Sequence, residues 1–272
     1  MYITNNPTVA QIAQRAGVDR IWIDLETLGK EERQAGMNTV KSKHSIDDIK
    51  KIKPLLTTSE LMVRVNPLNP GSQKEIDEVI DAGAQYVMLP MFRTAEDVAT
   101  FISYVGGRAK TILLLETIDA QKNLEKYVGY PGIDEIHIGL NDLHIQYGMD
   151  FMFELLADGT VEQIANILRK NNIRFGFGGF ARVGHGILPA EMILTDHYAI
   201  GSRMAILSRG FCDANIVENP NDVADIFKKG IEDIRAKEKE IEGYDSEDFK
   251  NNHAELKEKV KEIVTIIREK KS

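Results

Sequence analysis

Two carboxylate side chains, Glu116 and Asp142, are placed where each could bind a hard divalent cation. Glu116 closes the apolar run Thr-Ile-Leu-Leu-Leu-Glu-Thr, and Asp142 lies in Glu-Ile-His-Ile-Gly-Leu-Asn-Asp-Leu-His. Enzymes with parallel sheets carry their chemistry at the carboxyl ends of strands. Mg²⁺ and Mn²⁺ take carboxylate oxygens and keep positions for water and substrate oxygens. The alternative is structural: Asp142 caps the next turn and Glu116 pairs with an arginine.

Arg64 is a charged residue inside the apolar run Leu-Met-Val-Arg-Val-Asn-Pro. Its guanidinium stays charged and presents a planar fork to a carboxylate or a developing enolate oxygen. Asp24 and Glu26 end another apolar run, Trp-Ile-Asp-Leu-Glu-Thr. Because side chains alternate along a strand, these two point the same way and could face Arg64 or a metal-bound water. Structural pairing of Arg64 with Glu26 or Glu116 is compatible with a catalytic role.

The elements that must position these residues follow from alternating short apolar runs and amphipathic segments. This order is typical of βα units and a parallel sheet, and continuous Val/Ile/Leu character fits strands buried on both faces. Eight strands are expected, at residues 1–4, 20–26, 61–66, 86–90, 111–117, 135–141, 173–180 and 197–202. Helical spacing predicts helices that include residues 8–16, 46–56, 73–82, 96–105 and 161–170.

Eight strands in this order favour a TIM (β/α)₈ barrel over an open doubly wound sheet, and no Gly-x-Gly-x-x-Gly follows the first strand. The 272 residues fit one barrel of about 250 residues plus a tail. We expect a barrel domain at 1–227 and a charged helical extension at 228–272. An apolar stripe that includes Leu256 and Val260 must be covered, either by the barrel or by a neighbouring subunit.

Composition narrows the classes of partner. The net charge of -8, without a basic patch, argues against a nucleic acid or an anionic membrane surface. Cys212 is the only cysteine, which excludes an internal disulfide. The first residues do not have the pattern of a secretory signal, and no run reaches the roughly 18 apolar residues of a membrane-spanning helix. A cytoplasmic protein is expected.

Five blocks of sequence resemble the aldolase/citrate lyase family, which comprises 4-hydroxy-2-oxoheptanedioate aldolase-type and citrate lyase β-subunit-type pyruvate-binding barrels. The resemblance runs from about Val18 to Arg203, and the Glu-Thr and Asn-Asp-Leu blocks are its most specific parts. The blocks are Ile-Asp-Leu-Glu, Val-Arg-Val-Asn-Pro, Ala-Gly-Ala-Gln-Tyr-Val-Met-Leu-Pro-Met, Leu-Leu-Glu-Thr and Gly-Ile-Asp-Glu-Ile-His-Ile-Gly-Leu-Asn-Asp-Leu.

The resemblance implies a carbon–carbon lyase that cleaves a hydroxy 2-oxo acid or a related acid through a pyruvate-type enolate. It implies that Glu116 and Asp142 bind Mg²⁺ or Mn²⁺, with the carboxylate and oxo group of the substrate on the same ion. Arg64 matches the arginine that stabilises the enolate oxygen. Gly139 and Asn141 match positions whose backbone amides contact the substrate carboxylate. A homo-oligomer, a trimer or hexamer that exchanges C-terminal helices, is also implied.

One departure from the family concerns the general base: Thr27 occupies the position of the catalytic histidine in the aldolase branch. A threonine hydroxyl must itself be activated by another group. Candidates for the base are a metal-bound water, Glu26 and His44, with His144 a weaker one. His137 lies within an expected strand and is interpreted as a satisfied core residue.

A second candidate binding region combines Gly178 and Gly179 with Ser202 and Arg203. Barrels often bind phosphate at the loops after their last two strands, so these residues could hold a phosphate or a distal carboxylate. Two alternative functions therefore stay open. One is a metal-independent phosphosugar isomerase or epimerase, and the other is a catalytically silent scaffold that assembles through the charged tail. Substrate specificity is expected in the loops at 28–43 and 147–159.

Overall fold

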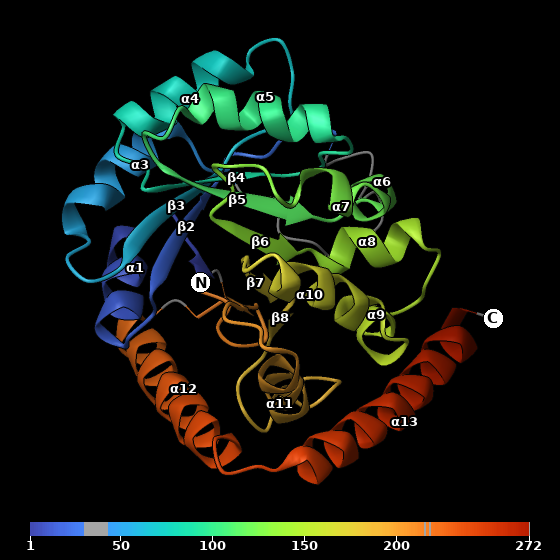
Figure 1. The fold of residues 1–272 in the computed structure, drawn as a ribbon. Helices are drawn as coiled ribbons and strands as arrows, with labels where there is room; N and C mark the ends of the chain where they lie inside the picture. The colour runs from blue at the N-terminus through green and yellow to red at the C-terminus, as the bar shows by residue number, and fades with distance from the viewer. Residues whose placement is uncertain (30–42, 215, 218, 272) are drawn as a thin grey trace.

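The chain forms an α/β structure around one parallel sheet (Figure 1). The computed structural model describes residues 1–29, 43–214, 216–217 and 219–271. Seven strands lie side by side in sequence order, and every neighbouring pair is parallel. They are β1 (Tyr2–Ile3), β2 (Arg20–Asp24), β3 (Glu60–Arg64), β4 (Tyr86–Leu89), β5 (Lys110–Leu115), β6 (Glu135–Ile138) and β7 (Arg174–Phe177). All their carboxyl ends therefore lie at one edge of the sheet.

Helices cover the outer face of this sheet (Figure 1). Local sequence fixes where they begin. Asn6 accepts backbone hydrogen bonds at the start of α1 (Pro7–Arg15), and Thr94 and Asp97 form a capping box at the start of α5 (Ala95–Val105). The helices between the strands are α1 (Pro7–Arg15), α3 (Ile46–Ile52), α4 (Ser72–Asp81), α5 (Ala95–Val105), α6 (Ile118–Lys122), α7 (Leu124–Tyr127), α8 (Leu140–Gln146), α9 (Glu154–Ala157) and α10 (Thr160–Lys170), with a 3₁₀ turn at Lys53–Leu55.

Successive residues of β2, β3, β4 and β5 enter two separate apolar clusters. On β2, Ile21 and Ile23 belong to the large cluster under the helices, whereas Trp22 belongs to a small inner cluster. This follows from the period of two along a strand. The inner cluster lies on the concave side of the sheet and consists of Met1, Trp22, Met62, Tyr86, Met88, Ile112, Leu114 and Met204.

The main sheet is an open half-barrel. A separate pair of short strands, β8 (Gly179–Phe180) and β9 (Ile206–Leu207), lies near its two edges. Ile206 donates its amide to the Gly178 carbonyl at 3.3 Å, and Leu207 donates to the Met1 carbonyl at 2.9 Å. The expected α/β class and parallel sheet are confirmed, but the assigned strands do not form a closed eight-stranded barrel.

The strand expected at 197–202 is wrong. Most of that segment belongs to α11 (Ala190–Ile200), which Gly201 ends with a φ of 77°. A short apolar run of this length does not distinguish a buried strand from a buried helix by periodicity. The preceding Ala-Glu-Met-Ile-Leu is rich in helix formers and extends the helix through the run.

Two long helices, α12 (Pro220–Ile241) and α13 (Ser246–Lys271), end the described chain and lie on either side of α11 (Figure 1). α12 also contacts α1, and α13 contacts α9. The apolar stripe of α13 is buried against this same chain. Residue 228, where the extension is expected to begin, falls inside α12, and the division into two domains stays a prediction. Among the described residues, no helix is long and apolar enough to cross a membrane.

Candidate active site

Arg64 is the centre of an ion-pair network at the carboxyl ends of β2 and β3. Its Nε and Nη2 donate to the two carboxylate oxygens of Asp24, both at 2.8 Å, and its Nη1 lies 3.1 Å from Oε2 of Glu26. Parallel register places Asp24 directly opposite Arg64. Burial disfavours the charge on Arg64, but Asp24 and Glu26 outweigh this effect and raise its pKa. The guanidinium is therefore held charged and in a fixed orientation.

Glu116 directly follows β5 and is 3% exposed. Its Oε1 accepts a hydrogen bond from the Met91 amide at 3.1 Å. Burial raises the pKa of Glu116 well above its usual range, the nearby charge of Asp142 raises it further, and Arg64 opposes both. Asp142 itself lies in the first turn of α8, which follows β6. The two neighbouring strand ends thus bring these carboxylates into one electrostatically coupled group.

These side chains line one cavity of about 310 Å³. It opens at the carboxyl ends of the strands and reaches the inner cluster. Its lining includes Asp24, Arg64, Glu116 and Asp142 at the strand ends, and Trp22, Leu114 and His137 below them. The segment that follows β9 contributes further lining residues, which are Ser208, Arg209, Cys212 and Asp213.

Gly139 separates β6 from α8 and lies directly against Glu116. A Cβ atom at Gly139 would be 2.7 Å from Cβ and 3.0 Å from Oε2 of Glu116, so any larger residue would displace that carboxylate. The expectation that the Gly139 amide binds substrate is not supported, because this amide donates to the Leu115 carbonyl at 2.8 Å and so continues the sheet. Gly139 and Asn141 both line the cavity.

The two candidate bases near β2, Glu26 and His44, differ in their surroundings from each other and from Thr27. The ring Nδ1 of His44 accepts a hydrogen bond from the Asp24 amide at 3.0 Å, which places His44 beside the ion-pair network. Glu26 is 3% exposed and pairs with Arg64. Thr27 is exposed, and its amide and hydroxyl both contact Oδ1 of Asn66. Part of the loop at 28–43, residues 30–42, lies outside the described residues.

The weaker histidine candidate is separate from this network. His144 lies on α8, and its Nδ1 is 3.0 Å from the Leu140 carbonyl of the preceding turn. Like Glu26 and His44, it is not among the residues that line the cavity. The histidine is therefore engaged with its own helix.

The carboxylate side chains at this cavity are of the kind that binds a hard divalent cation. Mg²⁺ is commonly bound through one or two carboxylates together with waters and substrate oxygens. Glu116 and Asp142 are the pair that supplies these oxygens, and both line the cavity. Within the described residues, no group of three or more His, Cys, Asp or Glu side chains is arranged to hold a metal.

The second candidate binding region does not form one site. Gly178 and Gly179 line the cavity beside Glu116, whereas Ser202 and Arg203 line a different cavity of about 410 Å³. That second cavity contains Arg20, at the amino-terminal end of β2. The expectation that the four residues together hold a phosphate or a distal carboxylate is therefore not met, because they line two cavities. The segment after α11 returns along the opposite end of the strands before it reaches β9.

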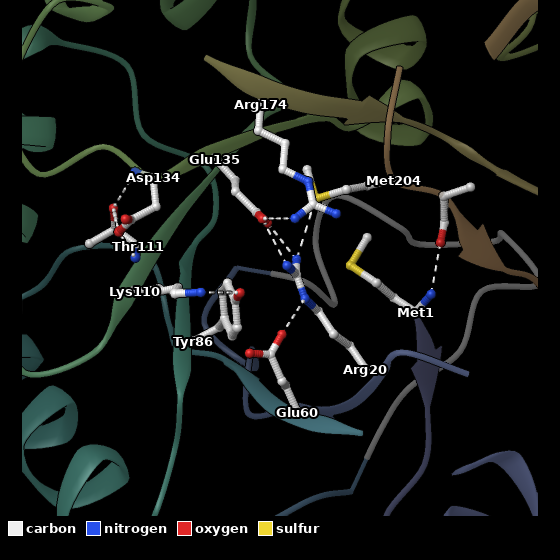
Figure 2. A network of polar contacts seen from close by, with 11 residues as sticks. Met1, Arg20, Glu60, Tyr86, Lys110, Thr111, Asp134, Glu135, Arg174 and Met204 are labelled. Carbon is white, nitrogen blue, oxygen red and sulfur yellow. Dashed lines mark hydrogen bonds and ion pairs between the residues drawn. The ribbon is translucent and has the colours of Figure 1, made fainter. Parts of the chain in front are cut away.

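Arg20 and Glu135 form a buried ion pair at the amino-terminal end of the sheet (Figure 2). Two Nη atoms of Arg20 donate to the two oxygens of Glu135 at 2.5 and 2.7 Å, and Arg174 adds a contact at 3.4 Å. Glu60 lies 3.6 Å from Nε of Arg20, and the guanidinium carbon stacks 3.9 Å from the centre of the Tyr86 ring. This network joins the starts of β2 and β6 across the concave side.

Sequence reasoning missed the polar character of the cavity floor. His137 is not a fully satisfied core residue: its Nε2 contacts the Gly178 carbonyl at 3.1 Å, but its Nδ1 has no hydrogen-bond partner among the described residues. Trp22 Nε1 also has no partner in that part of the chain. The available signal was strand alternation, which places Trp22 two residues below Asp24 and His137 two residues below Gly139 on the same inner face.

The comparisons of this chain with known proteins agree on one family. A model described as HpcH/HpaI aldolase/citrate lyase matches residues 1–172. A curated hydroxypyruvate/pyruvate aldolase from Rhizorhabdus wittichii is 25% identical over 183 residues, which cover 53% of this chain and 72% of that protein.

Solved structures with 14–16% identity support the fold alone. An HpcH/HpaI aldolase from Desulfitobacterium hafniense has a TM-score of 0.60 at 14% identity, covering 76% of this chain and 84% of its own. An aldolase/citrate lyase family protein from Burkholderia cenocepacia has a TM-score of 0.60 at 16% identity, with coverages of 76% and 87%. The citrate synthase SbnG has a TM-score of 0.59 at 14% identity, with coverages of 77% and 86%.

Proposed function

Since the chain belongs to the HpcH/HpaI aldolase/citrate lyase family and is an enzyme of the carbon–carbon lyase kind, we propose that it cleaves a hydroxy 2-oxo acid with the help of Mg²⁺ or Mn²⁺. The product half would leave as a pyruvate-type enolate. The observation that carries this proposal is the fixed, charged Arg64 at a cavity that also contains Glu116 and Asp142.

Arg64 is proposed to stabilise the negative charge that develops on the enolate oxygen. Asp24 holds two of its nitrogens at 2.8 Å, and Glu26 holds the third at 3.1 Å. A donor that is oriented before the reaction needs no reorganisation when charge develops, and this is usually the largest catalytic term. Asp24 and Glu26 thus act as positioning residues for Arg64.

Glu116 and Asp142 are the residues that would hold the metal ion. When bound, Mg²⁺ or Mn²⁺ supplies a Lewis acid that polarises the substrate oxo group. Burial disfavours the anionic form of Glu116, and the neighbouring Asp142 adds repulsion. A cation between the two carboxylates would relieve that repulsion, which is the physical reason for assigning the ion to this pair.

Glu26 and His44 are proposed to move protons. In the neutral ring of His44, Nδ1 accepts the Asp24 amide hydrogen, so Nε2 carries the proton. A carboxylate such as Glu26 suits the removal of the substrate hydroxyl proton and its return to the enolate carbon, and the Nε2–H of the neutral His44 ring would assist this transfer as a hydrogen-bond donor. Gly139 would let Glu116 keep its position against the β6–α8 turn because it has no Cβ, and Asn141 would contact the substrate carboxylate.

Pyruvate release from a panel of 4-hydroxy-2-oxo acids tests this function. Arg64→Lys should lower kcat/KM by about 10²–10³-fold, since a lysine cannot reproduce the oriented fork. Arg108→Lys is the matched control, because Arg108 is exposed and pairs with Asp77 far from the cavity. Turnover that survives both chelation and Glu116→Gln would contradict the proposal and favour a metal-independent barrel enzyme.

A further inference from the structure

Asn66 connects the chain after β2 to helix α4 through one side chain. It lies two residues after Arg64, at the carboxyl end of β3, and is half-buried. Its Oδ1 accepts hydrogen bonds from the Thr27 amide at 2.9 Å and from the Leu28 amide at 3.0 Å. Its Nδ2 donates to Oε1 of Glu75 at 2.7 Å, and its own backbone amide donates to the same carboxylate. Both polar atoms of this side chain are therefore bound.

The orientation of the Asn66 amide group follows from these partners. A backbone N–H can only donate, so the atom that faces Thr27 and Leu28 is the oxygen. The atom that faces the Glu75 carboxylate is then the nitrogen. Burial raises the pKa of Glu75, and the hydrogen bonds from Asn66 oppose this effect by stabilising the anion. Asn66 thus accepts on one side and donates on the other, and the two sides cannot be exchanged.

These contacts hold the backbone on both sides of Glu26. Before it, the Leu25 amide donates to the Arg64 carbonyl at 2.9 Å and continues the ladder between β2 and β3. After it, the Thr27 amide binds the Asn66 side chain where the next bond of that ladder would form. The backbone at Glu26 is therefore held alongside β3, with its carboxylate 3.1 Å from Nη1 of Arg64.

We propose that Asn66 and Glu75 are positioning residues for the proton-transfer carboxylate of Glu26. Asn66 fixes the chain directly after Glu26, and Glu75 fixes Asn66 from α4. Neither of the two lines the active-site cavity. The inference rests on the proposed function, in which Glu26 removes the substrate hydroxyl proton and returns it to the enolate carbon. A displacement of about 1 Å can cost about 10²-fold in rate, so loss of this pair should slow proton transfer.

Exchange of the methyl protons of pyruvate for deuterium measures this proton transfer without the physiological substrate. A proton leaves C3 to give the enolate, and a deuteron from D₂O is returned to C3, so the loss of the methyl signal in proton NMR gives the rate. Asn66→Ala should slow exchange by the Mg²⁺-loaded protein about 10- to 100-fold. Mn²⁺-dependent oxalate binding, measured by titration calorimetry, should change by less than about threefold, because oxalate binds without proton transfer.

A reversed pair tests the hydrogen-bond geometry itself. In Asn66→Asp a carboxylate still accepts the two amides, but it faces the carboxylate of Glu75 without a donor between them, and exchange should fall as in Asn66→Ala. Adding Glu75→Gln supplies that donor and restores the charge of the wild-type pair. The double variant should therefore recover exchange to within about fivefold of the wild type, since residues in direct contact have non-additive effects.

Asn69→Ala is the matched control. Asn69 lies in the same segment between β3 and α4, but its side chain binds the Gly71 amide and the Pro67 carbonyl of its own turn. This substitution loosens the segment without touching the chain after Glu26, so exchange should stay at the wild-type rate.

The negative results are distinguishable. Wild-type exchange in Asn66→Ala would overturn the positioning pair and leave the proposed function in place. A double variant as slow as Asn66→Asp would also overturn the pair, and this comparison decides if Asn66→Ala does not fold. A wild-type protein that binds oxalate with Mn²⁺ but exchanges no protons would overturn Glu26 as the proton-transfer group and the pair with it. No Mn²⁺-dependent binding of oxalate would overturn the proposed function.

Discussion

At the scale of single residues, the active-site charges are arranged around Arg64. One arginine faces two carboxylates at hydrogen-bond distance, and a second pair of carboxylates lies beside it in the same cavity. The sequence predicted that Asp24 and Glu26 share a face, because this follows from the period of two along a strand. It did not predict that Nδ1 of His137 lacks a partner among the described residues, because hydrogen bonding within a core depends on which carbonyl group the fold brings next to the ring.

Gly139→Ala tests how closely the cavity wall is packed. The new methyl group would lie 2.7 Å from Glu116 Cβ, so the carboxylate must move. We expect a loss of about 1–3 kcal/mol in the free energy of unfolding, measured by urea denaturation, and at least a tenfold loss of Mn²⁺ affinity.

The matched control for this substitution is Gly129→Ala. A Cβ atom at Gly129 meets nothing within 4 Å, and we expect a change within about 0.5 kcal/mol. If Gly139→Ala left both stability and Mn²⁺ affinity at wild-type values, the contact between Gly139 and Glu116 would have no role in shaping the site.

At the scale of elements, the order of strands and helices could be predicted because each βα unit has its own local signals. Seven expected strands overlap observed ones, since apolar runs between capped helices leave few alternatives. The eighth could not be located, because the run at 197–202 is compatible with either a strand or a helix. The residues that precede it determine that it forms the end of α11. The sequence also could not predict that Gly178 and Ser202 line different cavities, because this depends on the path of the chain around α11.

Glu135→Ala tests the ion pair that joins β2 to β6. Arg20 is 4% exposed, and without Glu135 its remaining carboxylate neighbour in the described chain is Glu60 at 3.6 Å. An uncompensated buried charge costs about 3–5 kcal/mol, so we expect a loss of this size in the free energy of unfolding.

Glu60→Ala serves as the comparison, because its side chain is 40% exposed and water can replace the contact. It should cost less than about 1 kcal/mol. Equal costs for the two variants, measured by chemical denaturation, would show that burial does not govern the strength of this network.

At the scale of the whole molecule, two buried histidines couple folding to pH. Burial lowers the pKa of His137 and of His197 to about 3. In the unfolded chain each imidazole takes up a proton near its ordinary pKa of about 6.5. The unfolded state therefore binds more protons between pH 6.5 and 3, so the histidines' contribution to stability is complete above pH 6.5 and falls as the pH is lowered.

His197→Phe should flatten this dependence. The ring stacks on Phe177 with centroids 3.7 Å apart, and phenylalanine can preserve that stacking. Between pH 6 and 4 the slope of unfolding free energy against pH should decrease by up to about 1.4 kcal/mol per pH unit. The exposed His185 provides a control, and His185→Asn should leave the slope unchanged. An unaltered slope in His197→Phe would show that this histidine is already protonated in the folded state.

The proposed divalent-cation site for an enolate lies at Glu116 and Asp142, next to Arg64. Titration calorimetry of oxalate, a planar enolate mimic, into chelator-treated protein with and without Mn²⁺ tests it most directly, with Asp142→Asn in parallel. We predict tight binding only with Mn²⁺, weakened about 10- to 100-fold in the variant, since changes that only disturb the support of a metal ligand already cost about this much in affinity. Oxalate binding that is the same without metal, or unchanged in Asp142→Asn, would contradict the account.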